Sequence, residues 1–258
     1  MRVIDRLEPE GMMLDHWRAR IGWIHPRVNS DIEVYDFYQA APKDVVLVVT
    51  HLEVVDSARR EEVETSLALL ERAVERLNLA GVDFIMKNGA PVHLHFGVDG
   101  HRKILERLRS ASKVPATTSS QALAEAFHWL KAKRILLISS WRKESVHLAD
   151  NLRNFLSAEG IEVPAVEGIG GRQLQSYEKL GLTPAEIYQN ALAVCAKHHD
   201  TDAVYIQSGT MATLGIIDEL EQKIGKPIVS SNSVNIWGSL KPLHVKVGPG
   251  FGQLLSSI

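Results

Sequence analysis

The chain of 258 residues contains a single cysteine, Cys195. One thiol excludes an intramolecular disulfide and any metal site that is built from several cysteines. The chain also lacks a strongly basic stretch, and its 29 Lys and Arg against 31 Asp and Glu give a net charge of −2. Without a basic footprint for phosphates, we expect no nucleic-acid partner.

Long apolar runs are missing as well. No segment reaches the roughly 18 consecutive apolar residues that a membrane-spanning helix needs, and the most apolar run, at 45–49, has the length of a strand. The N-terminus has no apolar core of signal-peptide length. A single cysteine is typical of a reducing compartment. We therefore expect a cytoplasmic protein with no membrane partner.

Short apolar stretches alternate with amphipathic ones along the chain. The apolar stretches are continuous and rich in β-branched residues, as in parallel strands covered on both faces. They lie at 21–24, 45–49, 82–86, 134–138, 203–206 and 227–229. Apolar residues at alternating intervals of four and three predict one helix over 63–77, and Thr183 followed by Pro184 predicts the start of another helix that runs to Ala196. This alternation predicts an α/β fold with parallel sheets.

Part of the sequence repeats itself. Residues 104–120 align with 216–232 without a gap, and 81–91 mirror 201–211 as strands that end in a glycine-containing turn. We favour a duplication over the chance likeness of two βα units. It predicts two similar Rossmann-like halves related by a pseudo-two-fold axis, with a ligand cleft between them where the strands end. The predicted division is an N-terminal extension at 1–20, a first half at 21–116 plus 233–258, and a second half at 117–232.

Several motifs at the predicted strand ends point to one family. They are IGWIHPRVN at 21–29, GVDFIMKNGAP at 81–91, AKRILLISSW at 132–141, the block at 201–240 with its SSN followed by tryptophan, and GPGFGQLL at 248–255. In these motifs the chain resembles the maleate isomerase and arylmalonate decarboxylase branch of the aspartate/glutamate racemase superfamily. The resemblance implies two α/β halves, no cofactor, a small dicarboxylate bound between the halves, and a homodimer or a larger homo-oligomer.

The chain departs from this family where the chemistry is expected. Family members use a cysteine in one or both of the turns that follow a strand, and by alignment these positions fall on Gly89 and Gly209. Cys195 lies in a predicted helix instead, where we interpret it as a small buried apolar residue. Trp141 stands where the family has a tyrosine. Because glycine can neither carry a proton nor attack a double bond, the thiol mechanism of the family cannot operate here.

The remaining residues of these turns favour anion binding. Backbone N–H groups of the turn around Gly209 can bind a carboxylate or enolate oxygen at the start of a helix, although an ordinary turn with a capping hydroxyl explains the same pattern. Arg27 can pair with a carboxylate or lie in solvent, and Asn29 matches a family asparagine that contacts substrate. The residues expected to bind substrate are Arg27, Asn29, Asn88, Gly89, Trp141, Ser208, Gly209, Thr210 and Asn232.

Histidine is the natural substitute for the thiol in acid–base chemistry. Of the 11 histidines, His25 and His93 are the candidate catalytic residues because they lie at or just after predicted strand ends. Residues 91–96, if extended, would place His93 and His95 on one face, as a pair of metal ligands requires. No carboxylate lies at close ligand spacing, so we assign no metal.

Three functions follow from these observations. The leading hypothesis is a cofactor-independent enzyme that acts at the carbon next to a carboxylate of a small organic acid, as a decarboxylase, isomerase or lyase without a catalytic cysteine. A decarboxylase is slightly favoured, because loss of CO₂ depends more on oxyanion stabilisation than on a base. The alternatives are a metal-assisted hydrolase or lyase that uses His93 and His95, and a non-catalytic protein that binds carboxylates.

Overall fold

The computed structural model describes residues 17–54, 56–57, 59–139, 146–169 and 182–258. These residues form two four-stranded sheets in which every neighbouring pair of strands is parallel. The first sheet has the order β2-β1-β3-β4 and the second the order β6-β5-β7-β8. The strands are β1 (Ala19–Arg27), β2 (Val45–Val54), β3 (Phe84–Lys87), β4 (Ala116–Thr118), β5 (Arg134–Ser139), β6 (Glu162–Gly168), β7 (Ala203–Gln207) and β8 (Ile228–Ser230). The same order in both sheets confirms the predicted α/β fold of two similar halves.

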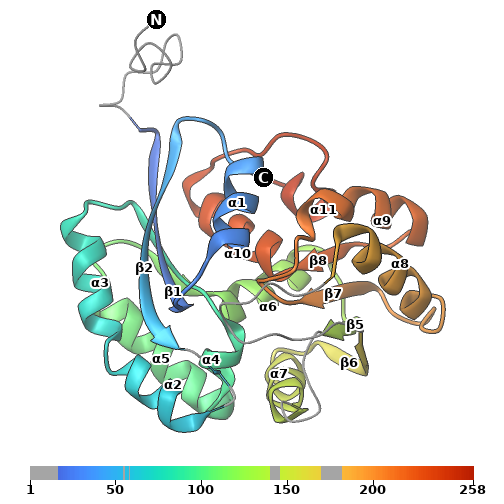
Figure 1. Cartoon of the computed structure of the whole chain (residues 1–258), viewed down its shortest axis with the longest axis horizontal. Coiled ribbons are helices and arrows are strands. Elements are labelled where there is room, and N and C mark those ends of the chain that lie inside the picture. Colours follow the sequence, from blue (N-terminus) through green and yellow to red (C-terminus); the bar gives the residue numbers. More distant parts are fainter. Residues whose placement is uncertain (1–16, 55, 58, 140–145, 170–181) are drawn as a thin grey trace, which may run out of the picture.

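Helices cover the sheets on both sides. They are α1 (Asp31–Ala40), α2 (Arg60–Leu67), α3 (Leu70–Leu79), α4 (Ala90–Leu94), α5 (Gly97–Ala111), α6 (Ser119–Trp129), α7 (Val146–Ala158), α8 (Pro184–Cys195), α9 (Ile217–Ile224), α10 (Ser231–Leu240) and α11 (Gly252–Leu255), with short 3-10 turns η3 (Leu214–Ile216) and η4 (Lys241–Leu243). Figure 1 shows α2, α3 and α5 on one side of the first sheet and α1 and α10 on the other. No helix within the described ranges is long and apolar enough to cross a membrane.

The core is shared between the halves. The side of the first sheet under α2, α3 and α5 has an apolar cluster of its own. The opposite side joins a larger cluster that also contains the strands of the second sheet, so that Trp23 and Ile206 belong to one core. The two sheets therefore bury their inner faces against common helices.

Two equivalent helices pack against each other at the centre of the molecule. Thr118 caps α6 by accepting a hydrogen bond from the Gln121 backbone, and Ser230 caps α10 in the same way through Ser233. A Cβ atom on Gly238 of α10 would lie 2.8 Å from the Cβ of Ala122 in α6, so the two helices approach closely. The matching caps confirm the ungapped alignment of 104–120 with 216–232.

Three details differ from the sequence expectations. The first strand begins at Ala19, inside the predicted N-terminal extension. The helix predicted over 63–77 is two helices, because the chain turns at residues 68 and 69, although its apolar positions are buried as expected. The strand β6 was not predicted, because it is an edge strand that contains Pro164 and two glutamates rather than a continuous apolar run.

The helix predicted from Thr183 is confirmed. Thr183 and Glu186 form a reciprocal capping box at its start, and α8 ends at Cys195 with Ala196 as its cap. The division of the chain into halves stays a prediction. Its boundary at 116/117 falls inside β4, which pairs with β3 in the first sheet.

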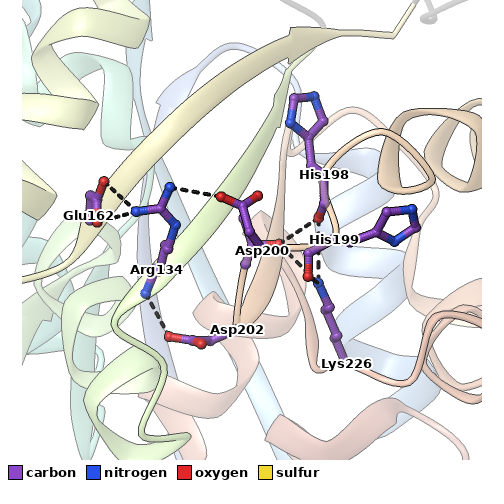
Figure 2. Close-up of polar contacts among 8 residues, drawn as sticks. Arg134, Glu162, His198, His199, Asp200, Asp202 and Lys226 are labelled. Carbon is purple, nitrogen blue, oxygen red and sulfur yellow. Dashed lines mark hydrogen bonds and ion pairs between the residues drawn. The ribbon is translucent and has the colours of Figure 1, made fainter.

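Polar contacts tie the amino ends of the second sheet together. Figure 2 shows the Arg134 guanidinium between Glu162, at 2.7 Å, and Asp200, at 2.8 Å. The Asp202 carboxylate accepts the Arg134 backbone N–H at 2.9 Å, and the Lys226 ammonium donates to the His199 carbonyl oxygen at 2.8 Å. This network aligns the strand starts, which leaves the opposite, carboxyl ends for the candidate site.

Candidate functional site

Buried polar side chains gather at the carboxyl ends of both sheets. His25 lies near the end of β1, Asn88 follows β3, Ser208 follows β7 and Asn232 lies in the first turn of α10, and each is less than a tenth exposed. Several polar atoms of these residues and of their neighbours along the chain have no hydrogen-bond partner among the described residues. These are Asn29 Oδ1, Asn88 Oδ1 and Nδ2, His93 Nε2, Gln207 Oε1 and Asn232 Oδ1. Buried polar atoms are normally paired, so this cluster indicates a place where a ligand or water completes the contacts.

His25 forms a buried pair with Glu33. Its Nε2 lies 2.9 Å from Glu33 Oε1, and the two side chains are 3% and 7% exposed. Its Nδ1 lies 3.3 Å from the Arg27 backbone N–H and 3.2 Å from the Arg27 carbonyl oxygen. The neutral ring can accept from the N–H and the protonated ring can donate to the carbonyl. His25 therefore has a partner in both protonation states, as an acid–base group needs.

Glu33 reaches from the first half to the second. A Cβ atom on Gly209 would overlap Glu33 Oε1 and would lie 3.0 Å from Glu33 Cδ. The carboxylate thus occupies the space that any side chain at position 209 would fill. Residue 209 is glycine because Glu33 lies there, and the His25–Glu33 pair faces the second turn directly.

A second carboxylate on α1 holds the same turn. Asn232 Nδ2 donates to Asp36 Oδ2 at 2.7 Å and to the Gly209 carbonyl oxygen at 3.3 Å. Burial raises the pKa of Asp36 to about 6, and Glu33 adds to the rise, while the hydrogen bonds from Asn232 and the Leu214 backbone oppose it. Helix α1 therefore docks onto the second half through two acidic side chains.

Glu33 and Asp36 were missed by the sequence analysis, because acidic residues in the first turns of a helix usually lie in solvent near its N-terminus. The signal that was available is their position: α1 directly follows the end of β1, where the site was expected.

The first turn also excludes a side chain. Gly89 has a φ of 91°, in the left-handed region that favours glycine, and a Cβ atom there would overlap Pro26 Cγ. Neither Gly89 nor Gly209 can be replaced by cysteine without moving its neighbour. For the first turn, where the neighbour is a proline ring and φ is positive, the structure therefore gives a steric reason why a thiol is missing.

Strand pairing corrects the match between the two turns. Asp83 Oδ2 accepts the Arg20 backbone N–H at 2.7 Å, as Asp202 does for Arg134 in the second half at 2.9 Å. Counting forward from these equivalent aspartates, Gly89 corresponds to Ser208. The sequence alignment, which pairs Gly89 with Gly209, is shifted by one residue at this point. Ser208 is buried, and its hydroxyl lies 3.1 Å from that of Thr210.

The structure separates His93 from the His25–Glu33 pair. His93 lies in α4 and is fully buried, with Nδ1 3.2 Å from the Ser120 hydroxyl. Burial first, then the nearby Lys87 and His101, lower its pKa well below the usual value. His93 is therefore neutral near pH 7, and it lies in the helix that directly follows the first turn.

Residues 91–96 are not extended, so the prediction that His93 and His95 share one strand face is wrong. Gly89 turns the chain and Pro91 sits at the start of a helix, so His93 is helical and His95 follows as the helix cap. The ring of His93 lies beside His101, with centroids 6.2 Å apart, whereas His95 lies 5.8 Å from His147. Within the described part of the chain, no three His, Cys, Asp or Glu residues gather as metal ligands.

Three other residues named in the sequence analysis have separate outcomes. Arg27 is half-buried, and burial lowers its pKa while Glu33, Asp31 and Asp56 oppose that shift. Trp141 lies outside the described residues. Cys195 is buried in α8, and burial raises its pKa to about 11. Its interpretation as a small buried residue is confirmed.

Comparison with known proteins identifies the family. A family model described as arylmalonate decarboxylase matches residues 51–255. The chain belongs to the arylmalonate decarboxylase family. It is 26% identical to the maleate isomerase of Pseudomonas putida over 252 residues, which cover 92% of this chain and 97% of the relative. Both names denote enzymes, and this member of the arylmalonate decarboxylase family is an enzyme of the racemase-like superfamily.

Solved structures agree with the fold. A mutant of arylmalonate decarboxylase in its liganded form superposes with a TM-score of 0.81 at 20% identity and covers 93% of this chain and 100% of its own. A cysteine-to-serine mutant of the Nocardia farcinica maleate cis-trans isomerase has a TM-score of 0.75 at 20% identity, covers 93% of this chain and 99% of its own, and carries a covalently bound succinylcysteine intermediate. The latter structure shows thiol chemistry on this fold, for which the present chain has no residue in either turn.

Proposed function

We propose that this family member is a cofactor-independent enzyme that acts at the carbon next to a carboxylate of a small organic acid, with His25 and Glu33 in place of the thiol. The observation that carries the proposal is the buried His25–Glu33 pair, which lies against Gly209 in the second turn. Maleate and arylmalonates, the acids named for the relatives, are the substrate classes to test first.

Binding would use the two turns. Backbone N–H groups at 208–210 lie in the turn after strand β7, at the edge of the sheet where parallel α/β folds bind ligands. The helix expected to begin in this turn starts later, with η3 at Leu214 and α9 at Ile217, so the turn itself would supply the N–H groups. Among the unpaired amide atoms, Asn88 Nδ2 can donate a hydrogen bond to a carboxylate oxygen, whereas the unpaired oxygens of Asn29 and Asn232 can accept one from water or from a protonated carboxyl group. Arg27 lies close enough to Glu33 for the two charges to influence each other, and its guanidinium can pair with a second carboxylate.

The proposed chemistry is a proton transfer at carbon. In a decarboxylation, the bond to the departing carboxylate breaks, CO₂ leaves, and the electron pair moves into the remaining carboxyl group as an enediolate. The N–H groups of the second turn stabilise the enediolate oxygen. Protonated His25, held by Glu33, then gives its proton to the carbon and regains one from water. For an acid with a hydrogen on a saturated carbon next to the carboxylate, His25 would remove that proton to form the same enediolate and return it to the carbon. The cis–trans isomerisation of maleate would instead need the imidazole of His25 to add to the double bond and leave again after rotation.

His93 contacts the Ser120 hydroxyl and the ring of His101, whereas His25 contacts the Glu33 carboxylate. The carboxylate partner favours His25 as the group that transfers the proton. The metal-assisted alternative loses its basis, because His93 and His95 do not share a strand face. Membership of a family of enzymes argues against a protein that only binds the acid, and turnover is the direct check.

The test is NMR of maleate, phenylmalonate and a panel of small mono- and dicarboxylates in D₂O, incubated with the wild type, His25→Gln and a control, His244→Gln, whose side chain is exposed. We expect deuterium at the carbon next to the carboxylate, or loss of CO₂, with the wild type and the control. General acid–base catalysis contributes about 10²–10⁴-fold, so His25→Gln should lose at least about 100-fold. Full activity of His25→Gln would contradict the assignment, and binding without any chemical change would support the binding-protein alternative.

A further inference from the structure

Lys87 is a fully buried amine at the end of β3. Its side chain has no exposed surface, and its ammonium donates to the Asn88 carbonyl oxygen at 3.0 Å. Burial alone lowers its pKa to about 7, and no charged side chain contributes to the shift. A buried lysine normally pairs with a carboxylate, and in the described structure Lys87 has none.

The groups around Lys87 are polar or basic. His93 from α4 lies close enough to Lys87 for their charges to interact, and His101 from α5 lies beside His93. Burial lowers the pKa of both histidines, that of His101 to about 4, so both are neutral near pH 7. In the sheet, Lys87 pairs with Ile24 of β1 and Thr118 of β4. His25 on β1 is already paired with Glu33, and α10, which also packs on β3, contains no titratable side chain.

Unpaired hydrogen-bonding atoms lie next to this amine. Both polar atoms of the Asn88 side chain and Nε2 of His93 have no partner among the described residues, and both side chains are at least 99% buried. Ser119, in the first turn of the 11-residue helix α6, has an unpaired hydroxyl as well. A buried cation beside unpaired donors and a helix start is the arrangement that an anion requires.

The second half shows that the fold does not need a lysine here. Lys87 pairs with Thr118, and the equivalent pair in the second sheet is Ile206 with Ser230. Ile206 is fully buried. An apolar side chain therefore fits this position of the sheet, whereas a buried amine costs free energy that packing does not return.

We propose that Lys87 is a substrate-binding residue that neutralises a carboxylate of the small organic acid at the Asn88–Gly89 turn. The inference takes the class of ligand, a small organic acid, from the proposed function, and it does not depend on the proposed chemistry. It gives the two turns different roles: the first holds a carboxylate through a cation, and the second stabilises charge through backbone N–H groups beside the His25–Glu33 pair.

A pH dependence follows from the charge of Lys87. The free protein loses the ammonium proton near pH 7, and only the protonated form attracts an anion. Affinity should therefore fall about tenfold for each pH unit above 7. At pH 8, binding should take up close to one proton, because the bound anion restores the ammonium form.

The test compares the wild type, Lys87→Met and Lys103→Met, a control on the exposed side of α5, by titration calorimetry with maleate and with inorganic sulfate at pH 6.5 and pH 8. Two buffers of different ionisation enthalpy at pH 8 measure proton uptake. We expect Lys87→Met to bind at least about tenfold more weakly at pH 6.5 and to lose the proton uptake, while the control behaves as the wild type. Lys87→Met should also melt at the same or a higher temperature, since a buried amine has been removed. Lys87→Ile, which copies position 206, serves if Lys87→Met misfolds.

Two results would overturn the proposal: unchanged affinity and proton uptake in the Lys87 variants, or no binding of either anion by the wild type. The outcome is separate from the test of the proposed reaction. Binding that depends on Lys87 without turnover would contradict the reaction alone, whereas turnover with unchanged binding in the Lys87 variants would contradict the role of Lys87 alone.

Discussion

Gly209 offers the most direct test of how the halves meet. In Gly209→Ala the new methyl group would overlap Glu33 Oε1, so the carboxylate must move away from His25. The displaced contact is a buried hydrogen bond of 2.9 Å between a carboxylate and an imidazole. Hydrogen bonds to charged groups contribute about 1.5–3 kcal/mol. We expect Gly209→Ala to lower the free energy of unfolding by about 2 kcal/mol.

A double-mutant cycle assigns this loss to its cause. In a Glu33→Ala background the obstacle is gone, and the same glycine-to-alanine change should cost less than about 0.5 kcal/mol, which leaves a coupling energy of about 1.5–2 kcal/mol. Gly215→Ala is the matched control, because a Cβ atom there meets nothing within 4 Å. At about 2–4 °C per kcal/mol for a chain of this size, Gly209→Ala should melt about 4–8 °C below the control.

The assay is urea unfolding followed by fluorescence and circular dichroism, with the slope of each transition checked for two-state behaviour. Turnover of any substrate found should fall in Gly209→Ala as well, because His25 loses its partner. The reasoning is refuted if Gly209→Ala is as stable as Gly215→Ala, or if it costs the same with and without Glu33.

Three further changes test separate features. Gly89→Ala should destabilise the protein by more than Gly97→Ala, although both glycines have positive φ, because only the former also meets a neighbouring side chain; equal losses in chemical denaturation would contradict the contact. Cys195, whose pKa burial raises to about 11, should resist iodoacetamide in the native state at pH 7.5, and any substrate turnover should survive the treatment; rapid labelling with loss of activity would restore a thiol mechanism. Burial raises the pKa of Asp36 in the folded protein from its usual 3.8 to about 6. The folded state therefore binds more protons between these values, and stability should fall as pH rises through that window, by up to about 3 kcal/mol. Asp36→Asn should lack this fall, and unfolding curves at pH 4, 5, 6 and 7 that run parallel for the two proteins would contradict it.

The fold could be predicted from the sequence because the patterns that indicate it are local and occur in both halves. Continuous β-branched runs identify buried parallel strands, and the ungapped match of 104–120 with 216–232 identifies two equivalent units of helix, short strand and polar tip, which are α5–β4 and α9–β8. The edge strand β6 escaped this reasoning, since one exposed side removes the continuous apolar pattern. The break between α2 and α3 escaped it because the apolar spacing continues across the turn.

Only part of the candidate site could be predicted from the sequence, because some of its contacts join residues that are far apart in the chain. His25, Asn88, Gly209 and Asn232 could be named because they end strands or begin helices, and the structure places them at the same edge. Glu33 could not, since its role depends on a contact with a glycine in the other half. The sequence alignment of the two turns was shifted by one residue, because it paired Gly89 with Gly209 as identical residues. The hydrogen bonds of Asp83 and Asp202 fix the register instead.

The helix α10 has a consequence for the order in which the protein can form. Trp23 of the first sheet is fully buried, and its indole N–H donates to the Ser239 hydroxyl at 2.9 Å across 216 positions of the chain. Until α10 has been synthesised, only α1 and α6 cover the inner face of the first sheet, Trp23 has no Ser239 to bind, and Asp36 of α1 has no Asn232 to bind. The first half, although made first, can reach its final structure only near the end of translation, and contacts over such separations form slowly. During that interval the part of the inner face that α10 will cover is exposed, which makes this stage the one most open to aggregation and to chaperone binding.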